Sequence, residues 1–334
     1  MGSLKRNKEI LLISTRNDEI STEDVFDWIL QLGHKPTRIN GDDLAEAGLD
    51  FQLTKSYIKV GQKKMKRYYD AIWFRRWSGH EFAFKVKEIL SKNISDIDLQ
   101  RNILNYIVKS HQSIKEYFIA DYFVSKKWLT KFSQANINKL RMLSVAKSCS
   151  LNVPNYIITN KKSDVEDFFK KTAGKLVTKD IDSPFFNFIG DGIYISFTEE
   201  INSAAIESLP VKFTITFFQE LIEKEFDIRV FYLDGKFYSM AIFSQSNERT
   251  KVDFRKNSSK EPNRTVPYKI PDKLGINFTK LMKLLGLTTG SIDLIKDKKG
   301  CYYFLEVNPV GQFGMVSKPC NYYLEEKVAE FLTS

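Results

Sequence analysis

Ser291-Ile292-Asp293-Leu294-Ile295 is separated by Asp297-Lys298-Lys299-Gly300 from a second run, Tyr302-Tyr303-Phe304-Leu305-Glu306-Val307-Asn308-Pro309. The two outer runs alternate in hydrophobicity and are rich in β-branched and aromatic residues, which is typical of strands. The short polar run between them is typical of a turn. We therefore predict an antiparallel hairpin whose second strand ends at Pro309.

One face of this hairpin carries oxygen ligands. Side chains alternate along a strand, so Glu306 and Asn308 point the same way. A four-residue turn places Asp293 opposite Phe304, or opposite Glu306 if the register slips by one pair, and in both registers the two carboxylates share a face within roughly 5–8 Å. Carboxylates this close repel each other unless a cation joins them, and such hard ligands suit a Mg²⁺ ion that substrate phosphates also hold. The alternative is a solvated hairpin with stray acids.

Length and composition limit the class of protein. A chain of 334 residues exceeds one ordinary core, and its composition is that of a soluble globular protein. No apolar run is long enough to span a bilayer, and the N-terminal segment does not fit a signal peptide. We therefore expect a cytoplasmic protein without a membrane partner. Three separated cysteines and three histidines argue against a disulfide framework, a zinc site and histidine-based catalysis.

The chain has a net charge of +10. This charge favours an anionic partner, such as a nucleotide, a nucleic acid or an acidic peptide, over a merely solvated surface. The lysines are scattered, with only short doublets such as Lys161-Lys162 and Lys298-Lys299. Nucleic-acid binding would need a concentrated basic patch, so we predict no nucleic-acid partner.

The first third of the chain predicts a small α/β domain. Residues 8–14, 36–40 and 71–74 are expected strands, and a helix that Ser21 caps and Gly33 ends lies between the first two. Residues 96–123 are expected to form an amphipathic helix. This order is a βαβ unit.

The rest of the chain is predicted to be α+β and mostly antiparallel. The expected helices are 138–149, 164–171 and 279–285, and the expected strands are 153–158, 175–179 and 213–219. Residues 226–233 and 236–243 form a predicted hairpin across Asp234-Gly235, and 246–266 a polar loop. We predict three domains: residues 1–122, 123–213 and 214–334.

In order along residues 120–320, a set of segments resembles the ATP-grasp ligases. The segments are Asn138-Lys139-Leu140, Val177-Thr178-Lys179, Gln219-Glu220-Leu221-Ile222, Asp227-Ile228-Arg229, Phe254-Arg255-Lys256-Asn257, Asp293 and Glu306-Val307-Asn308-Pro309. The continuation to Gly314, and Trp73-Phe74-Arg75-Arg76-Trp77 upstream, is similar to the graspetide maturases, which cross-link precursor peptides. The resemblance implies an ATP-grasp fold, ATP and Mg²⁺ as cofactors, and a precursor peptide with leader and core as partner. A homodimer is left open.

The segments that match also have physical roles. Lys139 and Lys179 would place positive charges on the α- and β-phosphates, and Lys179 ends an apolar strand that aims it into a cleft. The backbone of Gln219 to Ile222 could bind the adenine edge, while Leu221 and Ile222 cover its faces. The alternative for Lys139 and Lys179 is that they are simply exposed lysines. The alternative for Gln219 to Ile222, the predicted hinge between two lobes, is an ordinary strand end.

Two further pairs complete the predicted site. Asp227 and Arg229 share a strand face. The resemblance implies that Asp227 accepts from ribose hydroxyls, and the Arg229 fork suits a γ-phosphate or acyl phosphate. The alternative for this pair is a cross-strand ion pair at the surface. Arg255 and Asn257 are assigned to the phosphates by the resemblance alone. The predicted metal ligands are Asp293, Glu306 and Asn308, on the hairpin face.

Two segments leave alternatives open. The phosphate-covering loop of the family is often glycine-rich, whereas the corresponding residues 180–192 are aromatic, which favours a peptide-contacting surface. The Trp73–Trp77 segment is either part of the peptide site or plain core with two surface arginines.

The predicted reaction is transfer of the ATP γ-phosphoryl group to a carboxylate, followed by attack of a nucleophile on the acyl phosphate. In a graspetide maturase the carboxylate is Asp or Glu of the precursor, and the nucleophile is Ser or Thr (ester) or Lys (amide). The alternatives are another ATP-grasp ligase that adds an amino acid to a carboxylate, and a basic nucleic-acid-binding protein without ATP turnover.

Overall fold

The computed structural model describes residues 6–16, 19–41, 43, 50–77, 80–182, 186–189, 192–257 and 260–334. The chain divides into two compact units. The first comprises Met1–Asn136, Gln312–Ser317 and Tyr323–Ser334, and the second comprises Ile137–Gly311 and Lys318–Tyr322. The three-domain division, with boundaries at residues 122 and 213, stays a prediction. In the described part of the chain, no helix combines the length and the apolar composition needed to cross a bilayer.

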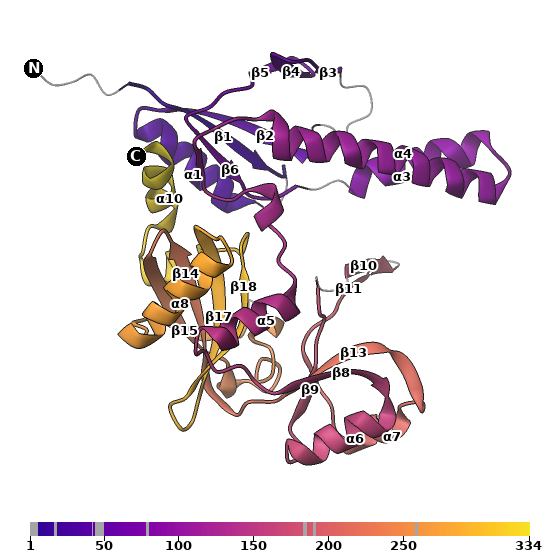
Figure 1. The fold of residues 1–334 in the computed structure, drawn as a ribbon, viewed down its shortest axis with the longest axis vertical. Helices are drawn as coiled ribbons and strands as arrows, with labels where there is room; N and C mark the ends of the chain where they lie inside the picture. Colours follow the sequence, from indigo (N-terminus) through magenta and orange to yellow (C-terminus); the bar gives the residue numbers. More distant parts are fainter. Residues whose placement is uncertain are drawn as a thin grey trace, which may run out of the picture. The chain divides into compact units, whose positions relative to one another are not determined.

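The first unit is built on a parallel sheet of order β2-β1-β6-β7 (Figure 1). Its strands are β1 (Glu9–Ser14), β2 (Lys35–Asn40), β6 (Ala71–Phe74) and β7 (Lys127–Trp128). Helix α1 (Ile20–Gln31) connects β1 to β2, and α10 (Leu324–Thr333) packs against α1. The predicted βαβ start is confirmed.

The predicted cap of α1 is wrong. The helix begins at Ile20 with Glu19 at the N-cap, so Ser21 lies within the first turn and is buried. Its hydroxyl donates to Gln312 Oε1 over 3.3 Å instead of capping a backbone amide. The end of the helix is as predicted, because Gly33 follows it with a φ of +80°.

A second, three-stranded sheet in the first unit escaped the sequence analysis. Strands β3 (Phe51–Leu53), β4 (Tyr57–Val60) and β5 (Lys63–Lys66) pair antiparallel in that order. These strands are short, and their lysines hide the alternation of Ile58, Val60 and Met65, which are buried. The segment also corrects the prediction of scattered lysines, because Lys55 to Asp70 holds six basic residues and one acidic residue.

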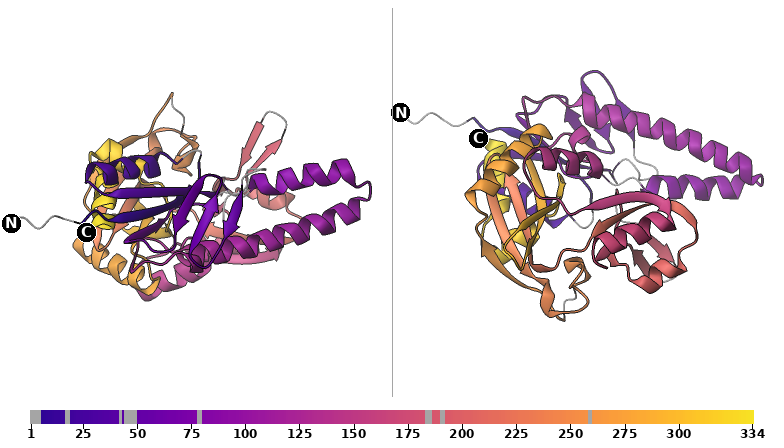
Figure 2. Two further views of the ribbon diagram at one scale, coloured as in Figure 1. Left: turned by 90° about the horizontal axis from the view of Figure 1, so that it is seen from above. Right: turned by 60° about the horizontal axis from the view of Figure 1, so that its bottom comes forward.

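The predicted long helix is α4 (Ile97–Tyr117), which continues into a π-helical turn at Phe118–Tyr122. Asp96 caps α4 by accepting from the amides of Asp98 and Leu99. Helix α3 (His80–Asn93) precedes it, and the two helices run side by side as a hairpin in both views of Figure 2. Phe118 and Tyr122 are fully buried in the core of the unit.

The second unit contains an antiparallel five-stranded sheet of order β16-β15-β14-β17-β18. Its strands are β14 (Lys224–Leu233), β15 (Lys236–Phe243), β16 (Arg264–Tyr268), β17 (Thr289–Asp297) and β18 (Tyr302–Asn308). Both predicted hairpins are confirmed. The predicted loop 246–266 is wrong at its end, where β16 adds an edge strand to the sheet.

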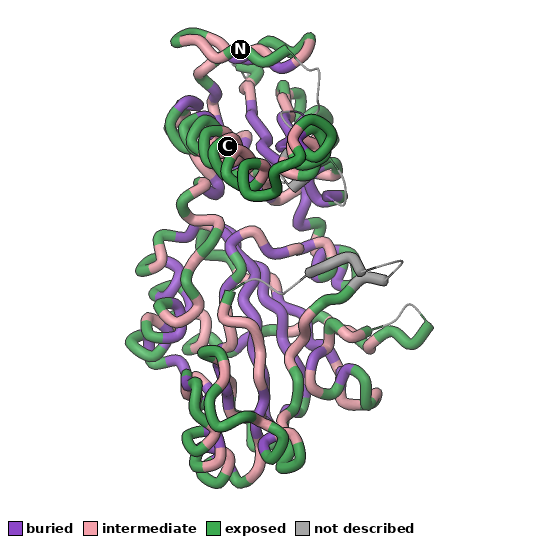
Figure 3. Tube along the Cα trace, turned by 90° about the vertical axis from the view of Figure 1, so that its right-hand side faces the viewer, coloured by how far each residue is buried: buried purple, intermediate pink, exposed green. Residues whose placement is uncertain are grey.

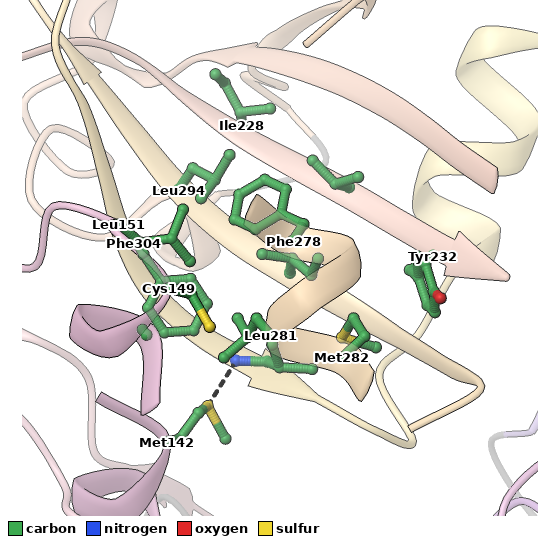
Figure 4. Packing of buried hydrophobic residues seen from close by; sticks show 14 of the residues in the cluster. Met142, Cys149, Leu151, Ile228, Tyr232, Phe278, Leu281, Met282, Leu294 and Phe304 are labelled. Carbon is green, nitrogen blue, oxygen red and sulfur yellow. Dashed lines mark hydrogen bonds between the residues drawn. The ribbon is translucent and has the colours of Figure 1, made fainter. Parts of the chain in front are cut away.

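Helices α5 (Lys139–Ser148) and α8 (Asp272–Leu284) pack against one face of this sheet. Figure 4 shows Met142, Phe278 and Leu281 among the side chains of the strands, and the amide of Val307 donates to the sulfur of Met142 over 2.8 Å. Most of β14 and β17 is buried (Figure 3). Because side chains alternate, Asp227 and Arg229 of β14 and Asp293 of β17 project from the other face.

The second unit also holds a small sheet of order β12-β9-β13-β8. Its strands are β8 (Tyr156–Lys161), β9 (Leu176–Thr178), β12 (Glu199–Glu200) and β13 (Lys212–Glu220), and helices α6 (Lys162–Lys171) and α7 (Ser203–Ser208) pack with it. A hairpin of β10 (Phe186–Ile189) and β11 (Gly192–Ile195) follows β9. The side chains of the predicted peptide-contacting aromatics lie outside the described residues. Helix α9 (Gly314–Cys320) follows β18.

Candidate active site

A row of charged side chains crosses the large sheet on the face opposite its apolar core. Arg229 on β14 is directly opposite Asp293 on β17, and Asp293 is directly opposite Glu306 on β18. Directly paired residues share a face, so the predicted approach of the two carboxylates is confirmed. The register is the slipped one of the two predicted, because the pairing shifts between Asp293 and Leu294.

Protein cations join these carboxylates. Arg229 Nη1 donates to both carboxylate oxygens of Asp293, over 3.0 and 2.9 Å. Lys139, the first residue of α5, places Nζ 3.2 Å from Glu306 Oε2 and donates to the carbonyl oxygen of Asp180 over 2.8 Å. Each acid of the row therefore has a basic partner of its own.

The two carboxylates ionise differently. Burial raises the pKa of Asp293 to about 6, although Arg229 opposes the rise. Burial also disfavours the charged form of Glu306, but Lys139 and Lys179 outweigh it and hold the pKa of Glu306 below its usual value. Of the two, Asp293 is therefore the one that takes up a proton first as the pH falls.

Lys179 is brought to the same site, as the sequence predicts. It directly follows β9, and its Nζ lies 5.8 Å from the ring centre of Phe217. Burial lowers the pKa of Lys179 to about 8, which Glu306 partly offsets. Glu306 interacts electrostatically with Lys139, Lys179 and Arg255, so three predicted phosphate-binding residues surround one carboxylate.

Asp227 is occupied by partners that the sequence analysis did not identify. Lys224 Nζ donates to Asp227 Oδ1 over 2.9 Å, and the hydroxyl of Ser244 donates to Oδ2 over 2.6 Å. All three residues are buried, and burial raises the pKa of Asp227. The carboxylate thus anchors the start of β14, and its contact with a ribose stays a prediction.

In the predicted adenine hinge, Gln219 to Ile222, two backbone amides form hydrogen bonds within the protein. The amide of Glu220 donates to Asn155 and the amide of Leu221 to Lys175, over 2.8 and 3.1 Å. The side chain of Glu220 accepts from the Asn155 amide group over 2.8 Å. Buried Gln219 Nε2 has no hydrogen-bond partner among the described residues, which makes it a donor to spare at the end of β13. Ile222 is buried, as a base-covering residue would be.

Arg255 and Asn257 belong to a loop that contacts itself. Arg255 forks onto Asp253, with Nε 2.9 Å from Oδ1 and Nη2 2.5 Å from Oδ2. Its charge still acts on the carboxylates of the row. Asn257 is exposed and accepts from the amide of Asn263 over 3.2 Å. The structure thus brings Arg255 to the site, but records no contact between Asn257 and the other predicted residues.

Asn308 is the most exposed of the predicted metal ligands. Its Oδ1 accepts from the amide of Val310 over 3.2 Å, and its backbone carbonyl accepts from Gly311 over 3.1 Å. It lies opposite Ser291, two pairs along the ladder from Asp293 and Glu306 and therefore on the same face. No cluster of three His, Cys, Asp or Glu side chains with metal-binding geometry occurs in the described ranges. A metal here would therefore rely on two carboxylates and an amide oxygen.

The Trp73–Trp77 segment is core with one buried arginine. Trp73 and Phe74 are buried, and Arg75 is only 2% exposed. Arg75 Nε donates to Glu19 over 3.0 Å and Nη2 to Gln312 Oε1 over 3.0 Å. The alternative of two surface arginines is therefore wrong for Arg75, because the acid of Glu19 makes burial of its charge possible.

The family model of the RimK-like ATP-grasp domain matches residues 136–332 of the chain. The protein belongs to this ATP-grasp family. Its match covers the second unit, including the five-stranded and the four-stranded sheet, so the α+β ATP-grasp fold expected from the sequence is confirmed. No curated protein matches the sequence significantly.

Solved ATP-grasp structures resemble the whole chain. A Chryseobacterium gregarium RiPP-associated ATP-grasp ligase, bound to ADP, a leader and a core peptide, has 22% identity and a TM-score of 0.80 over 98% of this chain and 95% of that one. Macrocyclase MdnC of Microcystis aeruginosa, bound to precursor peptide MdnA, has 24% identity and a TM-score of 0.78, and the match covers 97% of this chain and 98% of that one. ATP-grasp ligase PsnB, complexed with minimal precursor, Mg and ADP, has 19% identity and a TM-score of 0.70, and the match covers 97% of each chain. These likenesses establish the fold, including the N-terminal unit that the ATP-grasp family model leaves out.

Proposed function

We propose that the protein is an ATP-dependent peptide ligase. It activates Asp or Glu side chains of a ribosomal precursor peptide as acyl phosphates and joins them to Ser or Thr (ester) or Lys (amide) side chains, which closes macrocycles. The observation that carries the proposal is the row Arg229–Asp293–Glu306 with Lys139 and Lys179 around it, in an ATP-grasp domain. Full-length likeness to ligases solved with peptides supports the peptide as substrate.

The residues present fit ATP and Mg²⁺. Asp293 and Glu306 offer hard oxygen ligands from adjacent strands, with Asn308 beside them, which suits Mg²⁺ shared with phosphates. Lys139, Lys179 and Arg255 supply positive charge for the phosphates, and the spare donor of Gln219 lies at the strand end that leads into the predicted adenine hinge. When bound, Mg²⁺-ATP supplies the phosphoryl group that turns a carboxylate into an acyl phosphate.

The side chains of the chain then have separate tasks. Asp293 fixes the planar guanidinium of Arg229, so that its remaining donors would be available to an acyl phosphate and to the oxyanion that nucleophilic attack would form. Lys139 and Lys179 neutralise phosphate charge, and Glu306 keeps both lysines in place. No nucleophile is required from the enzyme, because the peptide supplies both reacting groups.

The test is mass spectrometry of candidate precursor peptides, produced together with the protein. We expect the loss of one water for each cross-link with the native protein and no loss with Glu306→Gln. Treatment with mild base, which cleaves esters and spares amides, separates the two linkages. Peptide that keeps its full mass, together with release of ADP in response to a free amino acid and a carboxylate acceptor, would instead favour a ligase that adds amino acids.

The cytoplasm, where ATP is available, is the proposed location, and a homodimer stays open. Nucleic-acid binding without ATP turnover is the less favoured function, because the basic side chains of the site are engaged with acids, Lys139 and Arg229 with those on the sheet and Arg255 with one in its own loop. Binding to DNA or RNA that weakens steeply with salt, without ADP release, would favour it.

A further inference from the structure

A cavity of about 190 Å³ lies in the first unit, and none of its lining residues belongs to the ATP-grasp site. Its inner wall is formed by buried Ile119 and Phe123 and half-buried Trp128 and Phe132. Exposed residues form its mouth, among them Lys131. An apolar cavity of about 150 Å³ is enough to bind benzene, so this aromatic pocket has room for one aromatic side chain.

The pocket has a structural cause in the chain. Helix α4 ends in the π-helical turn Phe118–Tyr122, which widens the backbone where Ile119 and Ala120 line the cavity. Wide turns of this kind are frequent at functional sites. The strand β7 and the 3₁₀ turn Phe132–Gln134 supply the other side. None of these elements contributes to the row of charges on the large sheet.

A basic sheet face, formed by Lys59, Lys64 and Lys66, adjoins the pocket along the chain. Lys59 and Lys64 are directly opposite each other on β4 and β5, and Lys66 is on the same face of β5 as Lys64. Like charges directly opposite destabilise a sheet, unless anions compensate them. Asp50 and Glu9 lie near two of these lysines, and with both acids counted the segment Lys55 to Asp70 keeps a net charge of +3, from six basic residues against three acids.

The backbone connects the basic sheet face to the pocket. Directly after β5, Tyr68 pairs with Val124, which lines the cavity. The amide of Val124 donates to the carbonyl of Arg67 over 2.9 Å, and Arg67 Nε donates to the carbonyl of Tyr122 over 3.2 Å. Among the described residues, β5 pairs only with β4 in this sheet, so β5 is an edge strand.

We propose that the basic sheet face and the aromatic pocket together bind an acidic peptide segment that carries one aromatic residue. The aromatic side chain enters the pocket, and neighbouring carboxylates lie along Lys59, Lys64 and Lys66. Charge complementarity selects an acidic peptide, and the pocket selects its anchor. The inference rests on the proposed function, which requires a peptide with Asp or Glu side chains, and assigns that peptide a second contact, made by residues of the first unit.

The experiment measures binding of a fluorescent peptide of glutamates with one central phenylalanine, by polarisation and without ATP. Lys64→Gln with Lys66→Gln should weaken binding roughly 2–30-fold, the range for two exposed charge pairs. The matched control is Lys170→Gln with Lys171→Gln on α6, which changes the net charge equally and should leave affinity unchanged. An equal loss in both variants would show general electrostatic attraction and overturn the proposal.

The pocket is tested by a cycle between protein and peptide. Replacing the phenylalanine by alanine should weaken binding to the native protein roughly tenfold, as expected for a largely buried aromatic ring. Ala120→Leu, which fills the mouth from an exposed position, should remove this difference, and Ser133→Leu serves if Ala120→Leu lowers the melting temperature. A phenylalanine effect that persists in the filled variants overturns the proposal.

Two further arms distinguish this surface from the ATP-grasp site and from a nucleic-acid site. Glu306→Gln should bind the probe normally, so loss of ligase activity and loss of this surface are distinguishable. A single-stranded DNA oligomer should compete more weakly than the glutamate peptide at equal charge. Tighter binding of the DNA that depends on Lys64 and Lys66 would assign the basic sheet face to nucleic acid and reject the peptide.

Discussion

Gly311→Ala should disable the site through Arg229. A methyl group at Gly311 would lie 2.6 Å from Ser291 Cβ, 2.8 Å from Ser291 Oγ and 3.1 Å from Arg229 Nη2. Ser291 is fully buried on β17, and its Cβ is fixed by the sheet backbone. The turn after β18 or the guanidinium of Arg229 must therefore move.

The size of the effect follows from these contacts. Overpacking of a closely packed site costs about 1–3 kcal/mol, which lowers the melting temperature by roughly 2–4 °C for each kcal/mol in a unit of this size. If Arg229 moves, one donor to the transition state is lost, and peptide-dependent ADP release should fall roughly 10²–10³-fold. The loss in rate should thus be far larger than the loss in stability suggests.

The assay compares ADP release with thermal melting in three variants. Gly290→Ala is the matched control: its new methyl group would lie 3.0 Å from Val307 Cγ1 and 3.4 Å from Met282 Cε, on the core face. It should lower stability and leave the rate nearly intact. Adding Ser291→Gly to Gly311→Ala removes the closest clash and should restore most of the rate. Equal rates for the two single variants, or no rescue by Ser291→Gly, would refute the reasoning.

Arg229→Lys should lower the rate roughly 10²–10³-fold with little change in nucleotide affinity, because the charge remains and the planar fork is lost; affinity that falls in step with the rate would contradict this. Glu306→Gln should abolish ADP release and lower the melting temperature of the free protein near neutral pH. Because the pKa of Glu306 is lowered in the fold, this deficit should vanish as the pH falls through that pKa, and a deficit that is independent of pH would argue for a packing role. Nucleotide affinity, measured by calorimetry, should fall as the pH rises above about 8, where Lys179 loses its proton, and Lys179→Arg should abolish the fall; a flat profile in the native protein would show that Lys179 does not bind phosphate.

The sequence predicts the charged row because alternation in long apolar strands is a strong signal. Asp293 and Glu306 share a face in either register, so their approach did not depend on the turn. The register itself was open, because the extra residue near Leu305 shifts the pairing and leaves no mark in the pattern. Lys139 begins helix α5 and Lys179 directly follows strand β9. The apolar residues of both elements are easily recognised in the sequence, so the positions of the two lysines at the element ends could be predicted.

The sequence could not predict partners that come from distant segments. Ser21 fits a capping pattern, yet Gln312, far along the chain, takes its hydroxyl. Arg75 looks like a surface residue until Glu19 is folded beneath it. The hydrogen bonds that Lys224 and Ser244 donate to Asp227 likewise depend on the β14–β15 pairing and on the turn that follows β15. In each case the deciding contact is electrostatic and carries no local periodicity.

Helix α10 gives the first unit an unusual order of assembly. Val328 and Leu332 of α10 are fully buried, as are Val25 and Ile29 of α1, and the two helices pack on each other. During synthesis, α1 leaves the ribosome long before residues 324–333 exist. The sheet can cover α1 early, but the part of its surface that α10 covers stays exposed while the second unit is made. A fragment that stops at Asn136 would keep the surface that α10 normally covers exposed, and we expect it to aggregate or to recruit chaperones. The N-terminal unit is therefore a product of the whole chain rather than a module that evolution or an engineer can excise.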